Sequence, residues 1–109
     1  MVRKPLKGPR VNIHRGTETG LRGKGTLADL RVLDLGRYIA APYCTQLLAQ
    51  QGAEVIRVEP PGGAPDRETM PIGVPGRGGM YLQMNGGKKS VTLDYSTPAG
   101  RAVLDALIR

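Results

Sequence analysis

A chain of 109 residues, 39% of them apolar and none of them Trp or Phe, is long enough for one small domain with an aliphatic core. Its net charge of +7 suggests a nucleic-acid or membrane partner, but seven of the sixteen basic residues lie within residues 1–26, beside a single acid. The remaining residues carry nine basic and eight acidic side chains, which excludes an extended basic surface on the globular part.

Residues 1–26 form a basic segment rich in glycine and proline, and we expect it to be a disordered tail that precedes a domain at 27–109. The segment has no apolar run suited to a secretory signal or a membrane span. An organelle transit peptide is the minor alternative, because glycine and proline interrupt any amphipathic helix there. Cys44 is the only cysteine, which excludes an internal disulfide and is compatible with the cytoplasm.

The domain begins with a predicted strand, helix and strand. Residues 32–35 are a short apolar run closed by glycine, and 55–58 are a second such run. Between them the pattern predicts a helix over 42–51, because Pro42 suits a first helical position and Gly52 suits a left-handed C-cap. The short spacing predicts a parallel βαβ unit with a right-handed crossover.

The second half of the domain begins with a predicted loop over residues 60–80, where 11 of 21 positions are Pro or Gly. Loops of this length inside a domain are usually functional, so a substrate lid or a segment awaiting a partner is expected. A third strand is predicted at 90–94, and Thr97-Pro98 predicts the N-cap and first position of another helix. Its apolar spacing continues to Arg109, so we expect the chain to be a fragment of a longer protein.

Several chemical motifs are weak. Residues 86–90 (Gly-Gly-Lys-Lys-Ser) are similar to a phosphate loop, but Leu82 stands where that loop needs glycine, and a strand follows. His14 has no carboxylates or cysteines nearby, so no metal site is expected. Cys44 is predicted to be a small buried hydrophobe on the apolar side of its helix, which pairs Tyr43 with Leu47 and Cys44 with Leu48. The acids form no obvious acid/base pair, and residues 66–68 are predicted to be surface charge.

The loop at 36–42 is the more useful feature. Ligands of open α/β sheets bind beyond the carboxyl ends of the strands, and a helix that starts there directs free N–H groups and its positive dipole end toward the crevice. A ligand that carries phosphate is therefore expected at this loop.

Blocks of sequence at 30–35, 40–48 and 52–63, followed by others at 85–94 and 97–101, occur in a recognisable order and spacing. Together they resemble the opening of family III CoA-transferases, also called CaiB/BaiF, over residues 27–109. The group includes formyl-CoA transferase, carnitine CoA-transferase and α-methylacyl-CoA racemase.

The resemblance implies an α/β fold, here a partial Rossmann-like βαβ unit of a large domain that forms an interlocked homodimer. It implies acyl-CoA and carboxylic-acid substrates, with no metal, nucleic acid or membrane as a partner. The family's nucleophilic aspartate forms a mixed anhydride and then an enzyme-bound CoA thioester. That aspartate is expected downstream of Arg109, so no catalytic residue is assigned to this chain.

The resemblance places coenzyme A contacts at Ile39, Ala40, Pro60, Leu93, Asp94, Tyr95 and Ser96. Three of these positions depart from the family pattern. Ile39 replaces a glutamine used by formyl-CoA transferase, Pro60 replaces a CoA-binding arginine of many members, and Ser96 stands where some members have lysine. Phosphate contacts are therefore expected from Arg37, Arg57 or backbone groups.

The alternatives are an acyl-CoA racemase of the same family and a small basic nucleic-acid-binding protein that uses the tail for phosphate contacts. The near-neutral domain and the lack of an aromatic stacking pattern disfavour nucleic acid. A remnant of a broken gene is compatible with the first hypothesis.

Overall fold

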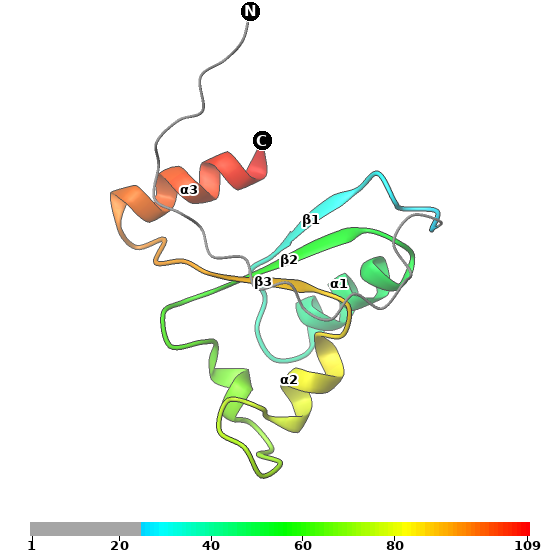
Figure 1. Cartoon of the computed structure of the whole chain (residues 1–109), viewed down its shortest axis with the longest axis vertical. Coiled ribbons are helices and arrows are strands. Elements are labelled where there is room, and N and C mark those ends of the chain that lie inside the picture. Colours follow the sequence, from blue (N-terminus) through cyan, green and yellow to red (C-terminus); the bar gives the residue numbers. More distant parts are fainter. Residues whose placement is uncertain (1–24) are drawn as a thin grey trace, which may run out of the picture.

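The computed structural model describes residues 25–109, which form a three-stranded parallel sheet flanked by helices (Figure 1). In chain order the elements are β1 (Arg31–Asp34), α1 (Ala40–Gln50), β2 (Glu54–Glu59), the 3-10 helix η1 (Pro65–Glu68), α2 (Gly79–Met84), β3 (Lys89–Thr92) and α3 (Pro98–Ile108). The predicted α/β class and the parallel βαβ unit are confirmed. Residues 1–24 of the predicted tail lie outside the described residues.

The sheet order is β1-β2-β3, with β2 in the centre. Asp34 of β1 pairs in register with Arg57 of β2, which pairs with Ser90 of β3. Because all three strands run in the same direction, the segments that follow them leave from one edge of the sheet. This edge is the place where the expected ligand site has to be sought.

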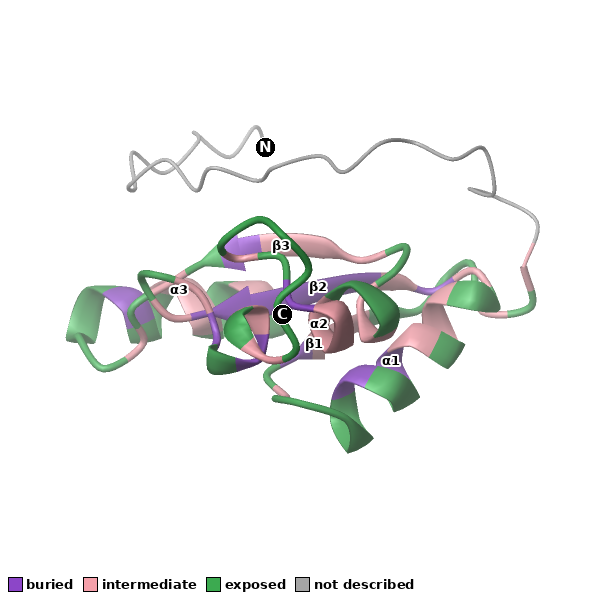
Figure 2. Ribbon diagram, turned by 90° about the horizontal axis from the view of Figure 1, so that it is seen from below, coloured by how far each residue is buried: buried purple, intermediate pink, exposed green. Residues whose placement is uncertain are grey.

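One face of the sheet is apolar and carries the hydrophobic core. Ile56, Val58 and Val91 are buried there, and Leu104 and Leu107 of α3 pack against them. Side chains alternate between the two faces of a strand, so Arg57 and Glu59 point to the other face, which α1, η1 and α2 cover. Figure 2 shows the central strand β2 coloured as buried along most of its length.

Helix α1 differs from its prediction in its start and in its buried face. It begins at Ala40, which puts Pro42 at the third helical position and not the first. Tyr43, Leu47 and Cys44 are exposed, so the predicted burial of Cys44 is wrong. The buried residues are Pro42 and Thr45, because Asp34 lies on the sheet face beneath α1 and Thr45 Oγ1 donates a hydrogen bond to its carboxylate.

The ends of the helices follow the sequence signals. Gly52 has φ 103°, the left-handed conformation expected just beyond α1. Thr97 caps α3, since its Oγ1 accepts a hydrogen bond from the N–H of Gly100 at 3.1 Å. Near the start of the described chain, the N–H of Leu27 donates to the carbonyl of Gln51 at 3.0 Å and holds this segment against the end of α1.

The predicted loop over 60–80 is more structured than its composition indicates. It contains η1, a bridge between Pro71 and Gly78, and the start of α2. Helix α2 was not predicted, because its six residues are too few to show a helical repeat and follow a run of Gly and Pro. Among the helices of residues 25–109, none is long and apolar enough to cross a membrane.

Candidate functional site

Three segments meet the edge of the sheet where the strands end: 35–39 after β1, 60–64 after β2 and 93–97 after β3. The sequence-predicted contacts lie in these segments or at the start of α1, so the topology gathers them along one edge. The N–H of Leu93 donates to the carbonyl of Glu59 at 2.8 Å, which joins the third segment to the end of β2. Ile39 and Ala40 are exposed, and Pro60 is half-buried.

The four residues after β3 divide between core and surface. Leu93 and Tyr95 pack against the apolar core, whereas Asp94 and Ser96 are exposed. Asp94 accepts hydrogen bonds from the Ser96 hydroxyl at 2.5 Å and from the Ser96 N–H at 3.0 Å, and the hydroxyl bond in particular lowers the pKa of Asp94. The polar groups that a ligand meets here are therefore those of a small Asx turn.

The start of α1 offers backbone donors. No side chain caps the helix at Ile39 and no acid lies in its first turn, so its first N–H groups have no partner from either source. Tyr38, just before, has φ 61°, a left-handed conformation that is uncommon for a residue with a side chain. Gly36 is required, because a Cβ there would lie 2.4 Å from the Cβ of Ala41.

Asp34, the last residue of β1, hydrogen-bonds both to segment 35–39 and to α1. Its carboxylate accepts hydrogen bonds from the N–H of Gly36 at 2.9 Å, from Thr45 Oγ1 at 2.7 Å and from Lys88 Nζ at 2.8 Å. Burial acts to raise the pKa of Asp34, but the three hydrogen bonds outweigh it and lower the pKa. Asp34 is therefore a buried anion that links β1, α1 and Lys88.

Lys88 is as buried as its partner, with a side chain that is 2% exposed. Burial lowers its pKa, and Asp34 opposes that shift. Because its ammonium is enclosed, the prediction that residues 86–90 are no phosphate loop agrees with the structure.

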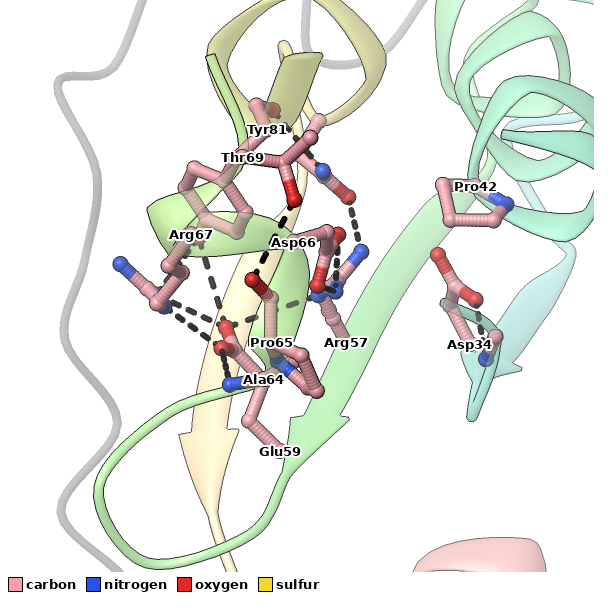
Figure 3. Close-up of polar contacts among 12 residues, drawn as sticks. Asp34, Pro42, Arg57, Glu59, Ala64, Pro65, Asp66, Arg67, Thr69 and Tyr81 are labelled. Carbon is pink, nitrogen blue, oxygen red and sulfur yellow. Dashed lines mark hydrogen bonds and ion pairs between the residues drawn. The ribbon is translucent and has the colours of Figure 1, made fainter. Parts of the chain in front are cut away.

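Arg57 lies on the polar face of β2 and is 1% exposed, so it is not available to a phosphate, contrary to our expectation. Its Nη2 donates to both carboxylate oxygens of Asp66, at 2.9 and 2.7 Å, and its Nη1 donates to Asn85 Oδ1 at 2.7 Å (Figure 3). Asp66 is fully buried, which makes the prediction of surface charge at this position wrong. The physical reason is that η1 folds Asp66 under the sheet, where it neutralises Arg57.

Glu59, two residues after Arg57 on the same face, is the centre of a second group. Its carboxylate accepts a hydrogen bond from Arg67 Nε at 2.6 Å (Figure 3). It also accepts one from Ser90 Oγ at 2.9 Å. Burial alone would raise its pKa, but bonds from Arg67, the Ala64 N–H and Ser90 lower the pKa to about 2. Arg67 also lies 4.0 Å from the centre of the Tyr81 ring.

Residues 27–109 match the family described as CoA-transferase family III. The chain belongs to this family. It is 48% identical over 83 residues to the succinyl-CoA–D-citramalate CoA-transferase of Chloroflexus aurantiacus, covering 75% of this chain and 21% of that protein. It is also 38% identical over 86 residues to the 2-methylfumaryl-CoA isomerase of the same organism, covering 78% of this chain and 21% of the isomerase.

A solved structure of a CAIB/BAIF family protein from Brucella suis has the same fold, with a TM-score of 0.71 and 36% identity. The match covers 79% of this chain and 24% of that one. This family III chain therefore spans about a fifth of the length of the curated relatives that it matches.

The buried ionic network of this family III chain was missed from the sequence, although one signal for it exists. Within β2, Arg57 and Glu59 alternate with the apolar Ile56 and Val58, so both charges point to one face of a central strand. A charge at a buried position requires a partner, and the nearest candidate was the acidic segment after the strand. No cluster of three metal-ligating side chains occurs within residues 25–109.

Proposed function

We propose that this chain forms part of the coenzyme A site of a family III CoA-transferase, which moves CoA between an acyl-CoA thioester and a carboxylic acid. One observation carries the proposal. The uncapped start of α1 lies at the edge of the sheet where the segments after β2 and β3 also emerge. Family membership makes a CoA thioester the ligand to expect there.

The backbone at Ile39 and Ala40 suits the phosphates, because helix N–H groups and the positive dipole end both favour an anion. Asp94 and Ser96 offer acceptors and a hydroxyl for the nucleotide end of the ligand. With Pro60 lacking a charge and Arg57 paired under the sheet, Arg37 is the exposed cation in the segment that precedes α1. We assign it the phosphate contact that an arginine at position 60 makes elsewhere in the family.

The proposed chemistry is covalent. An aspartate attacks the thioester carbonyl and expels the CoA thiolate, which leaves a mixed anhydride; the thiolate then attacks the aspartyl carbonyl and releases the first acid. The acceptor carboxylate attacks the aspartyl thioester and expels the thiolate, which gives a second anhydride. The thiolate finally attacks the acyl carbon of that anhydride, which forms the new acyl-CoA and releases the aspartate carboxylate. Asp34, Glu59 and Asp66 are buried in ion pairs, so we assign the nucleophile to a part of the relatives outside the matched fifth.

The test is an NMR titration of the chain with CoA and, separately, with inorganic triphosphate. We expect CoA to shift the amide signals of 37–42 and 93–96 first, with a dissociation constant of about 1 mM or weaker, worth roughly 4 kcal/mol. The triphosphate titration measures nonspecific electrostatic attraction to the basic residues, and salt screens this attraction. If both ligands shift only residues 1–26, and 150 mM salt abolishes the effect, the site does not bind CoA.

An acyl-CoA isomerase or racemase is the second candidate, because an isomerase is among the relatives. It would bind the same thioester but keep CoA on the same acid. Labelled CoA exchange into a carboxylic acid by the complete protein supports transfer, and isomerisation of the thioester without exchange supports the alternative. Family membership disfavours a nucleic-acid partner, and we propose that the complete protein acts as a cytoplasmic interlocked homodimer.

A further inference from the structure

Lys88 has a full set of hydrogen-bond partners. A lysine ammonium has three N–H donors. Those of Lys88 reach Asp34 Oδ2 at 2.8 Å, the carbonyl of Pro42 at 2.7 Å and Asn85 Oδ1 at 2.9 Å. The side chain is almost completely buried, so these acceptors replace the water that a lysine normally keeps.

The three acceptors belong to three different elements. Asp34 ends β1, Pro42 lies in the first turn of α1, and Asn85 is the C-cap residue just after α2. Thr45, one turn further along α1, donates to the same carboxylate oxygen of Asp34 at 2.7 Å. The start of α1 is thus held to the end of β1 at two points, of which Lys88 supplies one.

Asn85 extends the same arrangement to Arg57, since its Oδ1 accepts from both cations. The two cations are therefore fixed relative to each other by one amide oxygen, and each has a buried carboxylate of its own. Replacing either cation leaves a buried anion unpaired, which is costly.

We propose that Lys88 is a positioning residue, which sets where segment 35–39 and the first turn of α1 present their backbone N–H groups to the ligand. The proposal rests on the proposed function for its ligand, but the geometry that Lys88 controls exists without one. The Lys88 ammonium is enclosed, so it acts on segment 35–39 and the start of α1 through the carboxylate of Asp34 and the carbonyl of Pro42.

The neighbouring lysine provides a matched control. Lys89 begins β3 and Glu54 begins β2, and the two side chains pair there. This is the end of the sheet opposite to segment 35–39. The double variant Asp34→Asn/Lys88→Met removes one lysine–carboxylate pair without leaving a lone buried charge. Glu54→Gln/Lys89→Met makes the same kinds of change to the other pair.

The first measurement needs no ligand. Residual dipolar couplings report the orientation of α1 relative to β2, and exchange of the Tyr43 amide reports the opening of the first helical hydrogen bond, from the N–H of Tyr43 to the carbonyl of Ile39. We expect Asp34→Asn/Lys88→Met to change both, with exchange at least about tenfold faster, and Glu54→Gln/Lys89→Met to leave both close to wild type. Equal values in the two double variants would overturn the positioning role, whether or not CoA binds.

The second measurement titrates CoA into the same proteins. We expect the initial slope of the amide shifts at 37–42 to fall about tenfold in Asp34→Asn/Lys88→Met and to stay unchanged in Glu54→Gln/Lys89→Met. A wild-type chain that shows no shift contradicts the proposed function, while the couplings and exchange still decide the role of Lys88. If Asp34→Asn/Lys88→Met does not fold, Lys88→Arg keeps the charge but changes the geometry of the donors, and unchanged Tyr43 exchange in that variant contradicts the inference.

Discussion

At the scale of single residues, the main feature of this chain is that its polar sheet face is held by buried ion pairs. Arg57 and Asp66 form the central pair, and both are almost wholly shielded from water. Such a pair contributes little net stability compared with apolar side chains of the same size, but removing one partner leaves the other as an unpaired buried charge. The main effect of the pair is therefore to fix the position of η1, and its net contribution to the free energy of unfolding is small.

Replacing Asp66 tests this reading. Asp66→Ala leaves the Arg57 guanidinium buried with only Asn85 and the more distant Glu59 as acceptors, so we expect a loss of about 3–5 kcal/mol in the free energy of unfolding. Urea denaturation followed by circular dichroism measures it. Glu68→Ala is the control, since Glu68 is an exposed acid of the same helix. A difference between the two variants of less than about 1 kcal/mol would contradict the account.

At the scale of elements, local signals and tertiary contacts had different predictive value. The three strands, α1 and α3 followed from short apolar runs, glycine and the Thr97-Pro98 cap, because these signals act within a few residues. The buried face of α1 could not be predicted from these local signals. Apolar spacing favoured Tyr43 and Leu47, but the sheet beneath α1 presents Asp34, and a threonine satisfies that carboxylate where a leucine does not.

The candidate site shows the same division. The segments that follow β1 and β3 lie at one edge of the sheet, as expected for the carboxyl ends of parallel strands. Their bounds differ from the prediction, since α1 already begins at Ala40 and β3 ends at Thr92 and not at 94. Arg57 was expected to contact phosphate and does not, because that expectation needed the position of Asp66, which lies beyond a turn of Pro and Gly. Contacts across such a turn depend on its conformation, and composition does not specify it.

Helix α3 provides a test at this scale. In an ordinary helix, Gly→Ala adds about 0.5–1 kcal/mol of stability. Gly100→Ala is expected to lower stability instead, because its Cβ would lie 1.8 Å from the carbonyl oxygen of Asp94. Thermal unfolding compares it with Gly79→Ala at the start of α2, where the nearest atom would lie 3.3 Å away. A higher midpoint for Gly100→Ala would show that the close approach is not maintained.

At the scale of the whole molecule, two carboxylates held by cations, Glu59 and Glu54, make stability depend on pH. The pKa of Glu59 is lowered from its ordinary 4.5 to about 2, and bonds from Lys89 and then Arg31 lower that of Glu54 to about 2 as well. A carboxyl whose pKa is lower in the folded state binds fewer protons there than in the unfolded state. Its contribution is complete above about pH 4.5 and is lost as the pH falls through about 2.

We therefore expect the thermal midpoint of the chain to fall steadily on acidification between pH 4.5 and 2. Glu59→Gln removes one of the responsible groups and should flatten this dependence, although it also lowers stability at neutral pH by unpairing Arg67. Glu68→Gln should leave the slope unchanged, since Glu68 is exposed. The same slope in wild type and Glu59→Gln would mean that other carboxyls govern acid unfolding.

The order of the sheet also has a consequence for how the chain behaves in concentrated solution. Within residues 25–109, β1 and β3 each pair with β2 alone, so each has one side whose backbone N–H and C=O groups meet no other strand. Such borders are templates on which a further strand can add, including a strand of another molecule.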